Sequence, residues 1–214
     1  MKIAGVDEAG KGPVIGSMIV AGVMVQEDML PVLEGIGVRD SKAISPKKRE
    51  FLASKIKEVG VCYTLELSAS EIDALRKKTN MNEIVVESHV RVLKQLKPDE
   101  AFLDAADVDA DRFSKKVQAG YGKNIKITSE HNADVKYPLV SAASIIAKVR
   151  RDETVRELER LLGKNIGSGY PSDIRTMCFL DDWIKEHDSL PSFVRHSWKT
   201  AKNALKRHEK SRMV

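Results

Sequence analysis

The N-terminal stretch of the chain places acid at the end of an apolar strand. Residues 3–6 have the pattern of a short β-strand, and Asp7 and Glu8 follow it directly. A glycine turn, Gly10-Lys11-Gly12, then leads into a second apolar run over residues 14–25. At such a strand end, carboxylates can hold a hard cation, and the amides of the turn can meet a phosphate or a hydroxyl. Taken alone, the stretch is equally consistent with a hairpin that carries solvated charges.

The order of the remaining patterns indicates an α/β fold. Ser45 before Pro46, and Ser68 three residues before Glu71, are typical helix starts. We expect helices over residues 45–59, 68–77, 80–96, 111–119, 138–162, 172–187 and 197–210, and further strands over 61–67, 101–104 and 125–128. The chain begins with strands, continues with alternating strands and helices, and ends with helices alone. This order predicts a central mixed β-sheet flanked by helices, with a helical C-terminal extension.

Two further acids stand at positions like those of Asp7 and Glu8. Asp104 ends the strand over residues 101–104, and Asp134 precedes the long helix. Sites in α/β sheets gather beyond the carboxyl ends of strands, and carboxylates that converge there repel one another. Two divalent cations about 3.5–4 Å apart relieve this repulsion, and can activate water and stabilise the leaving oxygen of a phosphodiester. Oxygen ligands with room for water and phosphate favour Mg²⁺ or Mn²⁺.

These acids also have plainer interpretations. Asp104 competes with Asp107, Asp109 and Asp111, although Asp109 or Asp111 is the better helix cap. Asp134 could be a loop acid drawn to the positive end of the helix that follows.

Asp7 and Glu8 pose a geometric problem of their own. Adjacent strand residues point to opposite faces of a sheet. The two side chains can therefore share one metal only if the strand bulges, or if Glu8 offers its backbone oxygen instead.

One face of the long helix carries small hydroxyl side chains and a lysine. Ser141, Ser144 and Lys148 fall at positions i, i+3 and i+7. The serines fit tight packing of the helix on the sheet, whereas Lys148 fits either packing or contact with a nucleic-acid phosphate.

Six motifs occur in the order found in a known family. They are residues 5–16 (GVDEAGKGPVIG), Asp40-Ser41-Lys42, Leu103-Asp104-Ala105, Asp134, residues 141–149 (SAASIIAKV) and Ser168-Gly169-Tyr170-Pro171. Together they closely resemble the type 2 ribonucleases H, specifically the archaeal form of ribonuclease HII. The resemblance implies a ribonuclease H-like catalytic domain over residues 1–175 and a basic helical extension over residues 176–214 that aids substrate binding.

The resemblance also implies an activity. Family members are metal-dependent endoribonucleases that cleave the RNA of RNA–DNA hybrids and incise on the 5′ side of ribonucleotides embedded in duplex DNA. The products carry 3′-hydroxyl and 5′-phosphate ends. The implied cofactors are Mg²⁺ or Mn²⁺, with two ions when substrate is bound, and the implied setting is DNA replication and repair.

Site residues follow from the matched motifs. The family's metal-binding carboxylates match Asp7, Glu8, Asp104 and Asp134, its 2′-hydroxyl-reading turn matches Gly10, Lys11 and Gly12, and its sugar-stacking tyrosine matches Tyr170. The 2′-hydroxyl distinguishes RNA from DNA, and glycines let the backbone approach it closely. Outside this context, Tyr170 would be a loop aromatic that covers the core. Lys42 fits either a phosphate contact or an ordinary surface position.

The charge of the chain is concentrated at one end. The net charge is +5, and residues 195–214 hold seven lysines and arginines against one acid, which is typical of a nucleic-acid contact or of a solvated terminal helix. The last residues lack the glutamine–hydrophobic–aromatic pattern of a sliding-clamp peptide. Two cysteines and the lack of a long apolar run predict a cytoplasmic protein, which we expect to be monomeric.

Two rival functions remain open from the sequence. One is a non-catalytic protein that binds hybrids through the same groove, which the complete set of acids disfavours. The other is a different two-metal phosphoryl-transfer enzyme, such as a DNA nuclease, which Gly10-Lys11-Gly12 and Tyr170 disfavour.

Overall fold

A mixed β-sheet organises the chain. The computed structural model describes residues 1–38 and 44–211. Within them, the sheet has the order β3-β2-β1-β4-β5. Its strands are β1 (Lys2–Ala9), β2 (Met18–Gln26), β3 (Val61–Leu67), β4 (Glu100–Asp104) and β5 (Lys126–Glu130). Strand β1 pairs antiparallel with β2 and parallel with β4, and β4 pairs parallel with β5. The carboxyl ends of β1, β4 and β5 therefore lie together at one edge.

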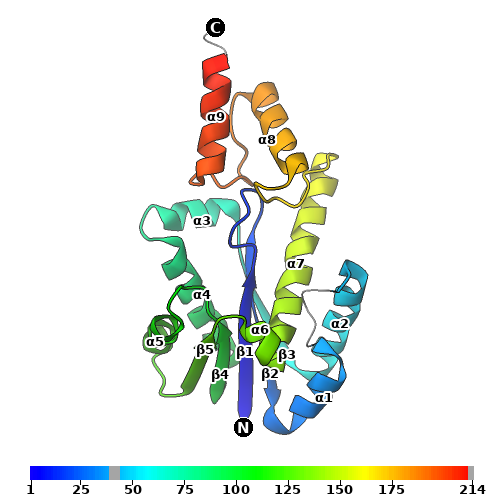
Figure 1. Ribbon diagram of the computed structural model, residues 1–214, viewed down its shortest axis with the longest axis vertical. Helices are drawn as coiled ribbons and strands as arrows, with labels where there is room; N and C mark the ends of the chain where they lie inside the picture. The colour runs from blue at the N-terminus through cyan, green and yellow to red at the C-terminus, as the bar shows by residue number, and fades with distance from the viewer. Residues whose placement is uncertain (39–43, 212–214) are drawn as a thin grey trace. The chain divides into compact units, whose positions relative to one another are not determined.

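Helices account for most of the remaining chain. A short 3₁₀ turn, Glu27–Met29, precedes α1 (Leu30–Gly35), and the others are α2 (Pro46–Val59), α3 (Ala69–Arg76), α4 (Met81–Leu96), α5 (Ala110–Tyr121), α6 (Ala133–Lys136), α7 (Pro138–Leu162), α8 (Ile174–His187) and α9 (Lys199–Ser211). In Figure 1, α4 and α5 lie to one side of β1, and α2 and the first half of α7 lie to the other. In the described residues, no helix is long and apolar enough to cross a membrane.

The chain forms two compact units, each made from segments that alternate in the sequence. The sheet unit comprises Met1–Ala9, Ile19–Glu66 and Met81–Arg150, and the turn unit comprises Gly10–Met18, Leu67–Asn80 and Arg151–Val214. These boundaries describe packing. The division into a catalytic domain over residues 1–175 and a substrate-binding extension over residues 176–214 stays a prediction.

Each unit has a hydrophobic core of its own. In the sheet unit, β1 and β2 pack against α2 and the first half of α7 through residues such as Ile19, Val23, Ile56 and Ile146. The closest approach is at Gly5, where an added Cβ would lie 2.3 Å from the carbonyl carbon of Leu139. Only glycine lets α7 lie this close to β1. The core of the turn unit includes Val14, Ile15, Phe179, Leu180 and Val194.

Local signals placed several helix ends correctly. The Ser45 side chain accepts a hydrogen bond from the Lys48 N–H at the start of α2. Ser68 and Glu71 form the predicted capping box of α3. Asp109 is the cap of α5, where its side chain accepts from the Arg112 N–H.

Two strand predictions were wrong in their extent, and one short helix was not predicted. Strand β1 continues through Asp7 and Glu8 to Ala9, so both acids lie within it rather than after it. Strand β2 begins at Met18, not at Val14. The short helix α6, which was not predicted, carries Asp134 just before the long helix.

Candidate active site

Asp7 and Asp104 occupy adjacent positions near the carboxyl ends of two parallel strands, and Asp134 follows the end of the third. In the β1–β4 ladder Val6 is opposite Leu103, so Asp7 and Asp104 occupy the next pair of positions. In the β4–β5 ladder Asp104 is opposite Glu130, the last residue of β5. Asp134 follows four residues later on α6 and is 4% exposed. The sheet edge thus gathers acids that are far apart in the sequence.

Asp104 also fixes the position of α6. Its Oδ1 atom accepts a hydrogen bond of 2.8 Å from the N–H of Ala133, the first residue of that helix. Since Asp134 comes next in the chain, this bond ties the start of the helix that carries it to the end of β4. The competing acid Asp107 is bound by Arg112, which holds the pKa of its carboxyl below the usual value.

Asp7 is buried beside other acids, which disfavours its charged form. Burial raises its pKa well above the usual value, and the nearby charges of Glu8 and Asp104 raise it further. The Ser144 hydroxyl, buried on α7, and the Glu8 N–H, which donates to Asp7 Oδ1 at 2.7 Å, act in the opposite direction. Ser144, for which packing was the favoured role, thus lies near enough to Asp7 to lower its pKa. A buried cluster of negative oxygens of this kind favours either a proton or a cation.

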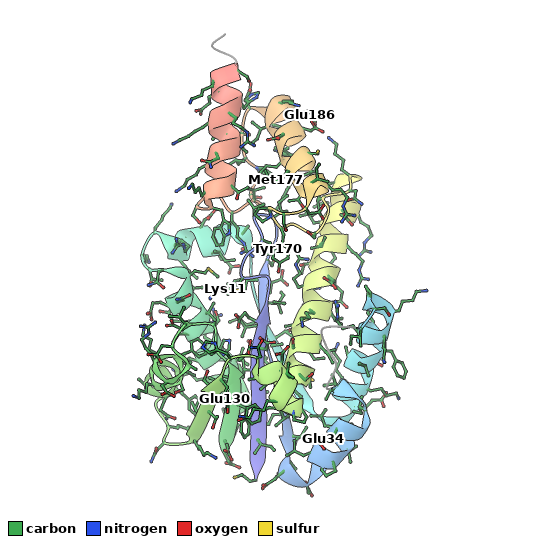
Figure 2. All side chains as sticks on the ribbon, in the orientation of Figure 1. Lys11, Glu34, Glu130, Tyr170, Met177 and Glu186 are labelled. Atoms are coloured by element: carbon green, nitrogen blue, oxygen red, sulfur yellow. The ribbon has the colours of Figure 1, made fainter. Side chains whose placement is uncertain are left out.

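Glu130 shows that a position at a strand end does not by itself raise the pKa of a carboxyl group. Its carboxylate accepts hydrogen bonds from Lys136 at 2.6 Å and from Tyr137 at 2.5 Å. These partners, Lys136 above all, lower its pKa. Figure 2 labels Glu130 on the end of β5. Glu130 is thus neutralised by protein groups, in contrast to Asp7.

The Glu8 side chain points away from Asp7, as strand geometry requires. Its Oε2 atom lies 3.2 Å from Nε2 of His89 on α4. His89 is fully buried and packs edge-on against Phe113, with ring centroids 5.2 Å apart. Asp7 and Glu8 therefore serve opposite faces of β1, with the backbone between them. Sequence reasoning missed His89, because a histidine in an apolar helix face gives no sign of its distant partner.

The residues fit a divalent cation by charge and by donor type. Asp7 and Asp104 supply carboxylate oxygens, which Mg²⁺ and Mn²⁺ prefer, and a bound cation would relieve the repulsion that raises the Asp7 pKa. Among residues 1–38 and 44–211, no three acid, histidine or cysteine side chains already form a metal cage. A metal site is thus indicated by the charge of the strand ends, not by preformed coordination.

The predicted turn and the predicted tyrosine are neighbours in the turn unit. A Cβ built on Gly12 would lie 3.6 Å from Cε1 of Tyr170. Tyr170 is 38% exposed, and the Arg151 guanidinium lies 5.4 Å from its ring centroid. Figure 2 labels Lys11 and Tyr170 on these two segments. Gly10 turns the chain with a φ of +83°, and an added Cβ would come within 2.7 Å of the Ser17 carbonyl oxygen.

The loop that carries Tyr170 is anchored through its neighbour Gly169. The Gly169 carbonyl accepts hydrogen bonds from the amides of Val14 and Ile15, at 2.8 and 3.2 Å. Its N–H donates to the buried Thr176 hydroxyl at 2.9 Å. The tyrosine loop and the segment after the glycine turn are therefore fixed to each other.

The positions of the remaining predicted residues say less about a role in substrate binding. Lys42, with its Asp40-Ser41-Lys42 motif, lies outside the described residues. Lys148 is half-buried on α7, and its predicted phosphate contact is not tested. Ser141 is fully buried and donates to the Val38 carbonyl, in agreement with the expected packing role.

Arg151 and Arg195 are the main features that the sequence concealed. Arg151 lies over the Tyr170 ring and donates to the Ser168 carbonyl. Arg195 was counted with the basic tail, yet it is fully buried and donates to the backbone of the glycine turn. No local pattern distinguishes such arginines from solvated ones.

Comparison with known proteins gives a consistent result. The model of the family described as Ribonuclease HII matches residues 4–201. A ribonuclease HII from Methanothrix thermoacetophila is 54% identical over 202 residues, which cover 94% of this chain and 96% of that protein.

Solved structures agree with the sequence comparison. The crystal structure of ribonuclease H2 from Pyrococcus horikoshii OT3 superposes with a TM-score of 0.92 at 42% identity, covering 98% of this chain and 100% of the other. RNase HII of Archaeoglobus fulgidus, solved in complex with PCNA, gives 0.87 at 41% identity, covering 93% and 96%. The predicted fold class is confirmed.

Proposed function

This chain belongs to the ribonuclease HII family, nucleases that act on the RNA of RNA–DNA hybrids, and from that we infer how its own residues do so. We propose that it incises on the 5′ side of a ribonucleotide within duplex DNA as well as within longer hybrids. The products would carry 3′-hydroxyl and 5′-phosphate ends. The observation that carries the proposal is the β1–β4 register, which places the buried Asp7 beside Asp104 at two adjacent strand ends.

The acids of the sheet edge are proposed to hold the metal. Asp7, Asp104 and Asp134 would contribute carboxylate oxygens, and Glu8 would contribute its backbone oxygen, since its side chain contacts His89. When bound, Mg²⁺ or Mn²⁺ supplies activation of the attacking water and stabilisation of the leaving 3′-oxygen, with two ions present on substrate. The Ala133 amide holds the Asp104 carboxylate at the strand end.

The turn unit is proposed to read the ribonucleotide. The backbone of Gly10, Lys11 and Gly12 would meet the 2′-hydroxyl, which both donates and accepts hydrogen bonds. Tyr170, in contact range of Gly12 and partly exposed, would stack on the next sugar. Lys42 and Lys148 would contact phosphates. The peptide bond from Ala9 to Gly10 joins the carboxylate strand directly to the reading turn.

We propose that α9 provides much of the affinity for the nucleic-acid duplex. Its lysines at positions 199, 202, 206 and 210 are exposed, whereas its apolar side includes the buried Ala201 and Ala204. We propose that these lysines bind phosphates along the duplex and that the chain acts as a monomer, without the PCNA partner seen with the A. fulgidus protein. Cys62 and Cys178 are both free, which fits the proposed cytoplasmic setting in DNA replication and repair.

A substrate panel tests the proposal. Three duplexes of one sequence are incubated with Mg²⁺ or Mn²⁺: one with a single embedded ribonucleotide, one RNA–DNA hybrid and one all-DNA control. We expect cleavage of the first two only, at the 5′ side of the embedded ribonucleotide, and no cleavage by Asp7→Asn. Cleavage of the all-DNA duplex, or tight hybrid binding with no cleavage in either metal, would overturn it.

A further inference from the structure

A buried arginine holds the backbone of the glycine turn from behind. Arg195 is fully buried, and its guanidinium donates to the carbonyls of Lys11 at 2.8 Å and Gly10 at 2.5 Å. It also donates to the Gly16 carbonyl from Nε and Nη2, at 3.1 and 3.0 Å. Its own N–H donates to the Val14 carbonyl at 2.8 Å. One side chain thus spans both ends of the segment from Gly10 to Gly16.

Trp198 completes this support. Its indole N–H donates to the Gly12 carbonyl at 3.2 Å, and its ring lies 4.9 Å from the Arg195 guanidinium. The carbonyls of Gly10, Lys11 and Gly12 are therefore all bound by two residues that lie three positions apart in the chain. The Trp198 ring also stabilises the buried cation through its π-face.

Binding the carbonyls from one side sets the direction of the amides. In a trans peptide, the N–H points opposite to the C=O of the preceding residue. Because Arg195 binds the carbonyls of Gly10 and Lys11, the N–H groups of Lys11 and Gly12 point away from the guanidinium. Pro13, which follows, has no N–H to offer.

The arrangement needs the shape of arginine, not only its charge. A planar guanidinium presents five donors in a fixed fork, whereas a lysine ammonium is a single, strongly hydrated point. Burial and the nearby charge of Arg151 lower the pKa of Arg195 to about 10, so the position is costly for a cation. The hydrogen bonds to the turn offset that cost.

We propose that Arg195, assisted by Trp198, is a positioning residue for ribonucleotide recognition. It would fix the direction in which the Lys11 and Gly12 amides meet the 2′-hydroxyl, and hold the turn beside Tyr170. The inference rests on the proposed reading of the 2′-hydroxyl by this turn. It also removes Arg195 from the set of basic side chains available to duplex phosphates.

The test compares Arg195→Lys with Arg150→Lys, a control in which an arginine paired with Glu66 at the surface is replaced in the same way. The first measurement is a ¹H–¹⁵N NMR spectrum of the full chain. We expect the Lys11 and Gly12 amide signals to shift in Arg195→Lys and to stay in place in the control. If the Lys11 and Gly12 amide signals do not shift in Arg195→Lys, the inference is overturned, regardless of which substrates the enzyme cleaves.

The second measurement is kcat/KM on the single-ribonucleotide duplex and on the long hybrid. We expect Arg195→Lys to lower the first value about tenfold or more and the second value less, because a misplaced turn weakens junction reading most. An equal fall on both substrates would indicate only a loss of folded enzyme, and would overturn the inference. Affinity for an all-DNA duplex should not change, since the charge is kept.

A replacement variant and the activity of the wild-type chain separate a failure of this inference from a failure of the proposed function. If Arg195→Lys does not fold, Trp198→Phe replaces it, because this variant keeps the aromatic ring and removes only the indole donor to Gly12. The same amide shifts and the same change in substrate ratio are then expected, and their absence counts against the inference. Failure of the wild-type chain to cut either substrate refutes the proposed function instead, and the NMR result still decides the role of Arg195.

Discussion

At the scale of single residues, Asp7 couples the stability of the chain to its chemistry. Its pKa is raised by burial, then by Glu8 and by Asp104, so the folded state holds the Asp7 proton more tightly than the unfolded chain does. The stabilising contribution of this group is thus fully present below its unfolded pKa, about 3.9, and is lost as the pH rises through its raised folded value.

Asp7→Asn should therefore melt at a higher temperature than the wild type at pH 7 in chelator. A gain of about 1 kcal/mol would raise Tm by about 2–4 °C in a chain of this size, and the gain should vanish at acidic pH. Scanning calorimetry at several pH values measures it, with Asp182→Asn at an exposed surface pair as the control. A lower Tm for Asp7→Asn at pH 7 would contradict the assignment of a strained carboxylate.

Glu8 offers a second comparison at this scale. Glu8→Gln keeps the backbone oxygen and a polar contact for His89, which lies 3.2 Å from the carboxylate. If Glu8 serves the metal through its backbone, this change should lower kcat less than Asp7→Asn, which is expected to cost several kcal/mol of transition-state stabilisation, or about 10³-fold. Single-turnover cleavage of the hybrid distinguishes them, and equal losses would assign a metal-binding role to the Glu8 side chain.

At the scale of elements, α9 makes a prediction about affinity. Lys202 and Lys206 are exposed and one helical turn apart. Replacing both lysines with Glu, which reverses their charge, should raise KM with little change in kcat. The dependence of log affinity on log salt should also become less steep, by about 0.9 for each lost phosphate contact. Reversing Lys57 and Lys94, exposed on α2 and α4, is the matched control. Identical salt slopes for the two double variants would show that α9 does not bind the duplex.

Elements defined by local signals were predictable, and those defined by distant partners were not. Helix α7 runs from Pro138 to Leu162 as expected, because proline marks its start and a glycine follows its end. Strand β2 was predicted to begin too early, because the amides of Val14 and Ile15 bond to Gly169, far away in the sequence. Helix α6 depends on Asn132, which adopts a left-handed conformation, and on the bond from Ala133 to Asp104.

At the scale of the whole molecule, the sequence indicated the candidate metal-binding acids better than it indicated the residues that hold the site in place. Asp7 and Asp104 could be chosen because acids at strand ends have a local signature, and the β1–β4 ladder brings them to adjacent positions. Asp134 was chosen in the same way, but the short helix α6 carries it. His89 and Arg195 could not be chosen, since their roles depend on burial and on partners 81 and more than 170 residues away. Charge counting placed Arg195 with the basic tail available to nucleic acid, although its side chain is buried.

The most direct test locates the metal. Crystals of the chain with Mn²⁺ and a hybrid whose scissile linkage cannot be cleaved would be measured at the manganese absorption edge. The account predicts anomalous density in contact with the carboxylates of Asp7 and Asp104, at the carboxyl ends of β1 and β4. Manganese bound elsewhere, with both carboxylates free of metal in a substrate complex, would contradict it.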